Sequence, residues 1–241
     1  MELKNHVTIM ILGDAFMDKI IFTYRLTHDT GFAPCVDNGL LTLACCKGGT
    51  ETVKRGLRYF IGRFFEENLQ KNVEVYISGI YADKLLYIAK IDKVITMNEY
   101  FVKKEYKDRT DQIYHPDGET LKRDERKLKG IHDDEHSYKC DIHGKYVLIS
   151  KEFVFLGNKA IDIDESILSF YPKGRGQYPK GQYSRTPVSV LTTENKNKSK
   201  ELYIKLQELI KEKGYTLTSG KVSEPHNPLK IGGGCNVCGK E

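Results

Sequence analysis

The run Lys19-Ile20-Ile21-Phe22-Thr23-Tyr24-Arg25-Leu26-Thr27 shows the first clear structural preference in the chain. β-Branched and aromatic side chains dominate it, which favours a strand. The Gly- and Pro-containing loop His28–Pro34 follows directly, and Asp37-Asn38-Gly39 is a second turn signal. The apolar run Leu40–Cys46 comes next and predicts a short buried strand.

Further strands are predicted over Val73–Ile80, Leu85–Val94, Lys145–Ser150 and Glu152–Leu156. Apolar residues at three- and four-residue spacing predict helices over Thr50–Asn68, capped by Thr50 or Thr52, and over Ser199–Lys213, ended by Gly214. Asn98 is a candidate cap for a short helix to about Lys104. We therefore expect an α+β fold with a mixed, mainly antiparallel sheet and flanking helices.

Two polar stretches interrupt this pattern, and both read as irregular chain. Asp108–Gly144 is almost wholly charged or polar and predicts a long loop, while Thr192–Ser199 predicts a linker. We expect an N-terminal extension or first strand over residues 1–19, one domain over residues 20–221, and a flexible cysteine-containing tail over residues 222–241.

The composition of this 241-residue chain is that of a globular protein, with 39% hydrophobic residues and a formal net charge of +5. That charge permits a polyanionic partner without requiring one. No apolar run approaches the ~20 residues of a membrane helix, and the short apolar patch near the N-terminus does not fit a signal peptide. Six scattered cysteines do not resemble a disulfide framework, so we expect a cytoplasmic protein without a membrane partner.

The loop after the first strand carries His28, Asp29 and Thr30, which could bind a ligand by hydrogen bonds. His28 and Asp29 could also act as an acid–base pair. The alternative, which the residues alone favour, is a turn in which Asp29 bonds its own backbone.

The segment Tyr171–Arg185 is basic and rich in glycine, and three tyrosines are interleaved with its charges. Lysine and arginine neutralise phosphates, and tyrosine rings offer stacking faces for bases. The alternative is a solvated loop without a ligand. Its pattern supports contact with a nucleotide or a nucleic acid as strongly as it supports the loop.

Two groups of residues resemble parts of a metal site. His132 and His136 would share a helix face, and Cys235 and Cys238 form a single CxxC pair. Neither has the spacing of a common zinc site, so we expect solvated histidines and no metal, with zinc as the candidate if one binds. The sequence assigns no other cofactor, and it contains no phosphate loop, GxGxxG or GxSxG motif.

Several ordered segments resemble the nucleotide modification associated domain proteins, in particular the second family of that name. They are Phe22–Pro34, Leu43–Lys47, Asp111–His115, Lys145–Gly157 and Gly174–Gln177. The resemblance implies a role beside phage and bacterial systems that modify or recognise nucleotides and DNA bases. The strand-rich middle also resembles the PUA-like barrels that read bases, which implies a partly open barrel as an alternative to the mixed sheet.

Carried onto this chain, the resemblance selects a set of ligand-binding candidates. They are Arg25, Asp29, Thr30, Phe32, Lys47, Tyr114, His115, Ser150, Phe153, Gly174, Arg175 and Gly176. Arg25, Lys47 and Arg175 would hold a phosphate, and Phe32, Tyr114 or Phe153 would stack on a base. Asp29 would accept a hydrogen bond from a base edge.

The sequence is compatible with two functions. The first is a binding protein for a nucleotide or a modified base. The second is an enzyme that acts on a nucleotide or base with His28, Asp29 or His115 as acid–base groups. A ligand site becomes the default if Asp29, His115 and Arg175 line one cleft.

Overall fold

The computed structural model describes residues 17–26, 29–48, 56–68, 72–118, 120–124, 135–172 and 193–226, with the backbone alone for His136 and Thr193. Its larger sheet has the strand order β1-β4-β5-β10-β12, with β11 paired to β5. These strands are β1 (Asp18–Leu26), β4 (Val73–Tyr81), β5 (Lys84–Lys90), β10 (Phe153–Phe155), β11 (Ile161–Asp162) and β12 (Gly220–Lys221).

Strands β1 and β4 run parallel along their whole length, from Asp18 opposite Val73 to Leu26 opposite Tyr81. The chain between them contains a hairpin and helix α1 (Leu57–Asn68). Strands β4 and β5, in contrast, form an antiparallel pair with an irregularity between Gly79 and Ile80. The carboxyl ends of β1 and β4 therefore lie at the same edge of the sheet, where ligands often bind in parallel sheets.

The second sheet has the order β2-β3-β9-β6 and is antiparallel. Its strands are β2 (Cys35–Asp37), β3 (Leu40–Leu43), β6 (Lys93–Thr96) and β9 (Tyr146–Ser150). The β2–β3 turn has positive φ at both Asn38 (48°) and Gly39 (72°). Asn-Gly suits this two-residue turn because both residues tolerate positive φ. The turn that Asp37-Asn38-Gly39 predicted is thus confirmed.

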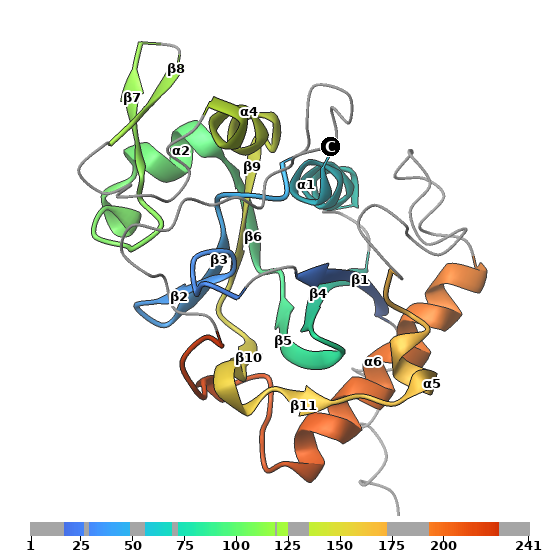
Figure 1. Ribbon diagram of the computed structural model, residues 1–241. Helices are drawn as coiled ribbons and strands as arrows, with labels where there is room; N and C mark the ends of the chain where they lie inside the picture. Colours follow the sequence, from blue (N-terminus) through green and yellow to red (C-terminus); the bar gives the residue numbers. More distant parts are fainter. Residues whose placement is uncertain are drawn as a thin grey trace, which may run out of the picture.

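Three groups of buried side chains hold these layers together. One face of β1 and β4 packs with α1 and the second sheet through residues such as Phe22, Phe64 and Leu148. The opposite face packs against α5 (Glu165–Leu168) and α6 (Thr193–Glu212), which lie below the larger sheet in Figure 1. The outer face of the second sheet is covered by α2 (Met97–Val102) and the β7–β8 hairpin (Tyr114–Asp117 and Thr120–Arg123).

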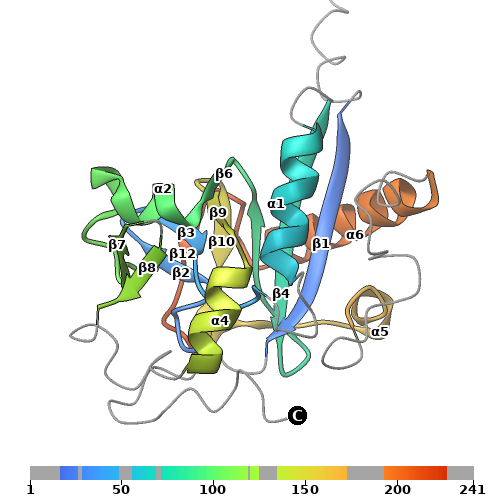
Figure 2. The same cartoon turned by 90° about the horizontal axis from the view of Figure 1, so that it is seen from above.

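The architecture confirms the expected α+β class. Within the described residues both sheets stay open and neither closes into a barrel. Figure 2 shows α1 between β1 and the strands of the second sheet, with α6 on the far side of β1. None of the described helices has the length and apolar character needed to span a membrane.

Two boundaries differ from the prediction. The single strand expected over Leu85–Val94 is two strands, β5 and β6, which belong to different sheets. The chain changes sheet at Ile91, whose N–H bonds the Val75 carbonyl at 2.7 Å. The short helix is capped by Thr96 rather than Asn98, because Thr96 and Glu99 form a reciprocal capping box.

The predicted loop over Asp108–Gly144 was wrong for most of its described residues. It contains the β7–β8 hairpin and helix α4 (Glu135–His143). Two of its charged residues, Arg109 and Asp111, are buried. Arg109 Nε donates to Tyr100 Oη at 2.8 Å and contacts Asp111 Oδ1 at 3.3 Å, so this polar stretch folds through ion pairing in the interior.

The C-terminal part is more ordered than the sequence predicted. Helix α6 begins at Thr193, so its first residues replace the expected linker, and Gly214 ends the helix region with a φ of 80°. Residues 222–226, here called the C-terminal strap, continue from β12 along the domain. The Val222 N–H bonds the Phe155 carbonyl at 2.8 Å, and the Asn158 N–H bonds the Glu224 carbonyl at 2.6 Å.

Candidate functional site

Asp29 follows β1 at the shared carboxyl edge of β1 and β4, and it is 1% exposed. Its Oδ2 accepts a hydrogen bond from the His226 backbone N–H at 2.8 Å. Its Oδ1 has no hydrogen-bond partner within the described part of the chain. Burial raises the pKa of this carboxyl, and the hydrogen bond from His226 only partly offsets that effect.

The C-terminal strap covers Asp29. The His226 ring stacks on Tyr81 with centroids 5.5 Å apart, and Pro225 lies against Gly31, where an added Cβ would come within 2.9 Å of Pro225 Cγ. The buried His226 Nε2 also lacks a partner among the described residues. The strap backbone therefore bonds the Asp29 carboxyl at the strand edge, while the His226 ring packs on Tyr81. The half-buried Thr30 lies next to Asp29 in the chain.

Arg25 lies on the face of β1 that packs toward α5 and α6. It pairs with Asp83 in the β4–β5 turn, and its Nε donates to the Pro172 carbonyl at 3.1 Å. Pro172 is the second residue of the basic segment Tyr171–Arg185 and its last described one, so Arg25 bonds the start of that segment. Arg25 therefore uses its Nε and Nη1 donors within the domain, which leaves fewer of its N–H groups for a ligand.

Lys47 lies on the other face of β1, where its Nζ is 5.4 Å from the centre of the Tyr24 ring. Adjacent strand residues point to opposite faces, so Arg25 and Lys47 are separated by the sheet. Cys46 and Lys47 both have positive φ, and buried Arg58 fixes this turn by donating to the Cys46 carbonyl at 2.6 Å. The geometry does not bring Arg25 and Lys47 together around one phosphate.

Phe32 and Tyr114 belong to the core beneath α2, each 3% exposed. The Tyr114 hydroxyl donates to Asp141 Oδ2 at 2.7 Å, and burial raises the Tyr114 pKa further above its ordinary value. Neither ring has a face open to a base. Ser150 is also buried, with its hydroxyl bonded to the Glu152 carbonyl at 3.0 Å.

His115 is exposed on the β7–β8 hairpin, opposite Lys122. That hairpin stands apart from the carboxyl end of β1 in both overall views (Figures 1 and 2). His115 and Asp29 therefore do not form one acid–base site. Several predicted candidates lie outside the described residues or side chains: His28, Gly174, Arg175, Gly176, His132, His136, Cys235 and Cys238.

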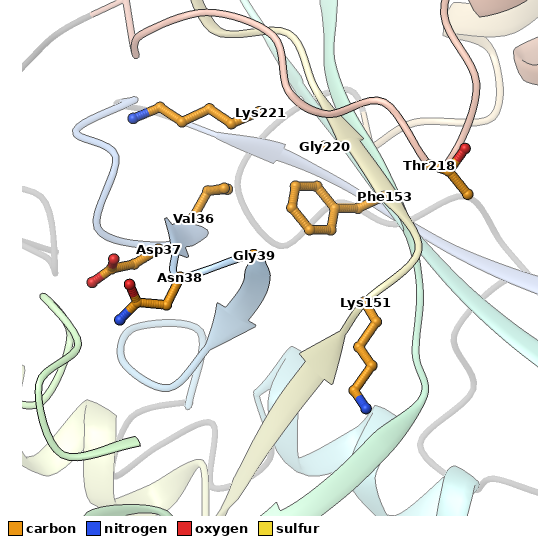
Figure 3. Close-up of a pocket in the computed structure, with 9 residues that line it drawn as sticks. All are labelled: Val36, Asp37, Asn38, Gly39, Lys151, Phe153, Thr218, Gly220 and Lys221. Carbon is orange, nitrogen blue, oxygen red and sulfur yellow. The ribbon is translucent and has the colours of Figure 1, made fainter. Parts of the chain in front are cut away.

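Phe153 reaches a pocket of about 410 Å³ between the β2–β3 hairpin and the segment that leads into β12. Figure 3 shows its ring at the centre of the lining residues, which are Val36, Asp37, Asn38, Gly39, Lys151, Phe153, Thr218, Gly220 and Lys221. Phe153 is itself 2% exposed and belongs to the core, so only a small part of its ring forms the apolar floor of the pocket. A pocket of this size falls within the range of small-molecule sites.

The charged side chains of this pocket differ in how strongly they are already bonded within the protein. Asp37 Oδ2 is held by the backbone N–H and the hydroxyl of Thr110, at 2.9 and 3.0 Å. Burial raises the Asp37 pKa, but these bonds outweigh it and lower the pKa overall. Lys221 pairs with Glu224 at 2.9 Å on the surface, and Lys151 Nζ is exposed. The two ammonium groups are therefore accessible to an anion.

Among the lining residues, Phe153 is the one that the sequence analysis predicted as a ligand-binding candidate. Thr218 and Lys221 come from a polar segment without a motif, and only the pairing of β12 with β10 brings them to the β2–β3 hairpin. The reverse error concerns Tyr171, which was grouped with the stacking tyrosines. It is 1% exposed and its hydroxyl lies 2.6 Å from that of Ser78, so it is a core residue.

No group of three or more metal-binding side chains occurs within the described ranges. The described cysteines, Cys35, Cys45, Cys46 and Cys140, form no disulfide. Burial raises the pKa of Cys35 to about 12 and that of Cys45 well above its usual value. These two buried thiols are therefore poor nucleophiles and poor metal ligands.

Residues 17–194 match the family model described as nucleotide modification associated domain 2. The chain belongs to this family. No curated protein and no solved structure was found to match it. The nucleotide modification associated domain 2 match covers β1 through the start of α6, and with them Asp29, Lys151 and Phe153.

Parts of both candidate regions lie beyond the segment that matches nucleotide modification associated domain 2. They include Thr218, Gly220 and Lys221 in the pocket and His226 over Asp29. The family assignment associates the chain with nucleotide modification.

Proposed function

We propose that this protein binds a nucleotide or a modified base in the pocket above Phe153. The observation that carries the proposal is the composition of that pocket, which combines an apolar floor with two accessible lysines. A base needs an apolar surface from which water is excluded, and its phosphates need cations. The family's association with nucleotide modification supports this ligand class.

The lining residues can divide these tasks. The half-buried Val36 and the small accessible part of Phe153 would contact the base, while Lys151 and Lys221 would contact phosphate oxygens. The surface pair between Lys221 and Glu224 is weak because both side chains are solvent-accessible, so a phosphate can replace Glu224 as the partner of Lys221.

The direct test is titration of the protein with deoxynucleoside monophosphates, followed by thermal unfolding and calorimetry. At about 100 times Kd we expect stabilisation of about 2.7 kcal/mol, or an increase in Tm of roughly 5–10 °C. Lys151→Gln and Lys221→Gln should each weaken binding about fivefold, since each removes about 1 kcal/mol of surface attraction.

Lys159→Gln is a matched control, because Lys159 is exposed and lies outside the pocket. Its affinity should equal that of the unmodified protein. Absence of any thermal shift or heat of binding with all four monophosphates would reject the proposal.

The alternative function is an enzyme that acts on a nucleotide or a base through Asp29. It is favoured by the raised pKa of this buried carboxyl and by the electrostatic interaction of the carboxyl with His226. A carboxyl with a raised pKa can accept and return a proton near neutral pH more readily than an ordinary one. In this alternative, His226 replaces His115 as the histidine of the acid–base pair.

Asp29→Asn tests that alternative, because it keeps an acceptor oxygen for the His226 N–H and removes the titratable group. Turnover of nucleotide substrates should disappear while the circular dichroism spectrum is unchanged. Turnover that persists in Asp29→Asn would exclude Asp29 as the acid or base.

A further inference from the structure

The arrangement of the two pocket lysines bears on the kind of nucleotide that the pocket takes. In Figure 3 the Lys151 and Lys221 side chains lie on opposite sides of the Phe153 ring, and their ammonium groups point away from each other. Two cations that converge would suit one compact phosphate. Two that diverge suit an anion that continues past the pocket in both directions.

The positions of both lysines are set by the backbone. The Lys151 N–H donates to Asp92 Oδ2 at 2.5 Å, which fixes the turn between β9 and β10. Lys221 belongs to β12, where it pairs with Phe155 of β10. Lys151 therefore starts from the bend between β9 and β10, and Lys221 starts from β12, so the backbone places the two side chains on opposite sides of the Phe153 ring.

We propose that the pocket holds one nucleotide of a single-stranded nucleic acid, with the phosphates on its two sides held by Lys151 and Lys221. This inference rests on the proposed function and narrows its ligand. Single strands combine a regularly charged backbone with bases that are free to leave the stack, which a pocket with an apolar floor and flanking cations can use. In a duplex the base edges are paired, so entry into this pocket would first cost unpairing.

Accessibility of the pocket supports the same ligand. Asn38, Lys151, Thr218 and Lys221 are all exposed. A strand can therefore enter and leave along the surface without opening the domain. A closed cavity would instead select a free mononucleotide.

The experiment compares three ligands by fluorescence anisotropy. A labelled oligothymidylate of about 12 nucleotides and a labelled duplex of equal length are titrated directly, and unlabelled thymidine monophosphate competes with the oligothymidylate. We expect the oligonucleotide to bind at least tenfold more tightly than the monophosphate and more tightly than the duplex. The salt dependence of oligonucleotide binding is then measured for the double variant Lys151→Gln/Lys221→Gln. Its slope of log K against log salt should be smaller by about 1.4, or about 0.7 for each lost phosphate contact.

The control is Lys104→Gln/Lys159→Gln, which removes two exposed lysines outside the pocket and should leave the slope unchanged. If the monophosphate binds the pocket as tightly as the oligonucleotide, the strand inference is overturned while nucleotide binding stands. If the oligonucleotide binds but both double variants change the slope equally, binding is diffuse and the pocket assignment is overturned. If neither ligand binds, the proposed function fails as well.

Discussion

Replacement of Arg58 by methionine should strongly destabilise the domain. Arg58 is fully buried at the start of α1, and its guanidinium donates to three carbonyls. Nε bonds Cys46 at 2.6 Å, Nη2 bonds Asp141 at 2.6 Å, and Nη1 bonds Tyr146. These bonds join α1, α4, β9 and the turn that follows β3. Methionine preserves most of the side-chain volume but leaves three buried carbonyls without these donors.

The expected loss of folding free energy follows from the three lost hydrogen bonds. Each buried acceptor that loses its partner costs about 1–3 kcal/mol, and the three are not fully additive. We therefore expect a loss of about 3–5 kcal/mol, a large part of the ~5–15 kcal/mol that stabilises a typical domain. In urea, with a slope of about 1–3 kcal/mol per molar, the midpoint should fall by more than about 1 M.

Arg63→Met is the matched control, since Arg63 lies on the same helix but pairs with Glu67 on the surface. Its loss should be at most about 1 kcal/mol. Urea unfolding followed by circular dichroism measures both variants. If Arg58→Met costs no more than Arg63→Met, the buried hydrogen bonds do not contribute as argued.

Three further predictions concern pH and packing. Burial raises the pKa of Glu74, but hydrogen bonds from neighbours such as Lys19 outweigh it and lower the pKa from 4.5 to about 2. The stability advantage over Glu74→Gln, about 1–2 kcal/mol after screening by solvent, should therefore be lost as pH falls from 4.5 to 2, which acid titration of unfolding would measure. The pH dependence of stability at Asp29 has the opposite sign. Its pKa is raised, so its contribution to stability is present below pH 3.8 and is lost as the pH rises through the folded pKa. On acidification the protein should therefore gain stability relative to Asp29→Asn, and a stability difference that does not change with pH would contradict this. Gly62→Ala should cost about 1–3 kcal/mol in thermal unfolding despite a better helix residue, because its Cβ would lie 2.4 Å from Cγ of the Tyr146 ring.

Local sequence patterns predicted most of the regular elements. The β-branched run became β1, the apolar repeat beginning at Leu202 became the buried stripe of α6, and Asn38-Gly39 made a hairpin turn. These predictions succeed because strand, helix and turn preferences depend on side chains within a few residues. The expected helix over Thr50–Asn68 is present from Leu57 onward in the described residues.

The errors have a common physical cause. The stretch around Arg109 and Asp111 was interpreted as a solvated loop because charged residues are usually exposed. In the interior these two charges instead pair with each other, and both side chains hydrogen-bond the hydroxyl of Tyr100, which lies on α2. The partner of a buried charge is chosen by tertiary contact, so composition alone misclassifies such a segment.

For the candidate site residues, too, the motifs selected positions whose surroundings only the tertiary structure decided. Ordered motifs led to the family, which the match over residues 17–194 confirms, and singled out Asp29 and Phe153. They also selected Phe32 and Tyr114, whose rings proved to be core residues. A motif records that a residue type recurs at a position, but it does not distinguish packing from ligand contact.

The sequence by itself therefore determined the α+β class, the main strands and helices, and the family. Only the tertiary structure decided that Arg25 and Lys47 lie on opposite faces of β1, that the strap brings His226 to Asp29, and that Lys221 joins Lys151 and Phe153 around one pocket. The physical reason is the range of the interactions. Local preferences act over a few residues, whereas these sites depend on strand pairing between segments far apart in the chain, such as β10 with β12.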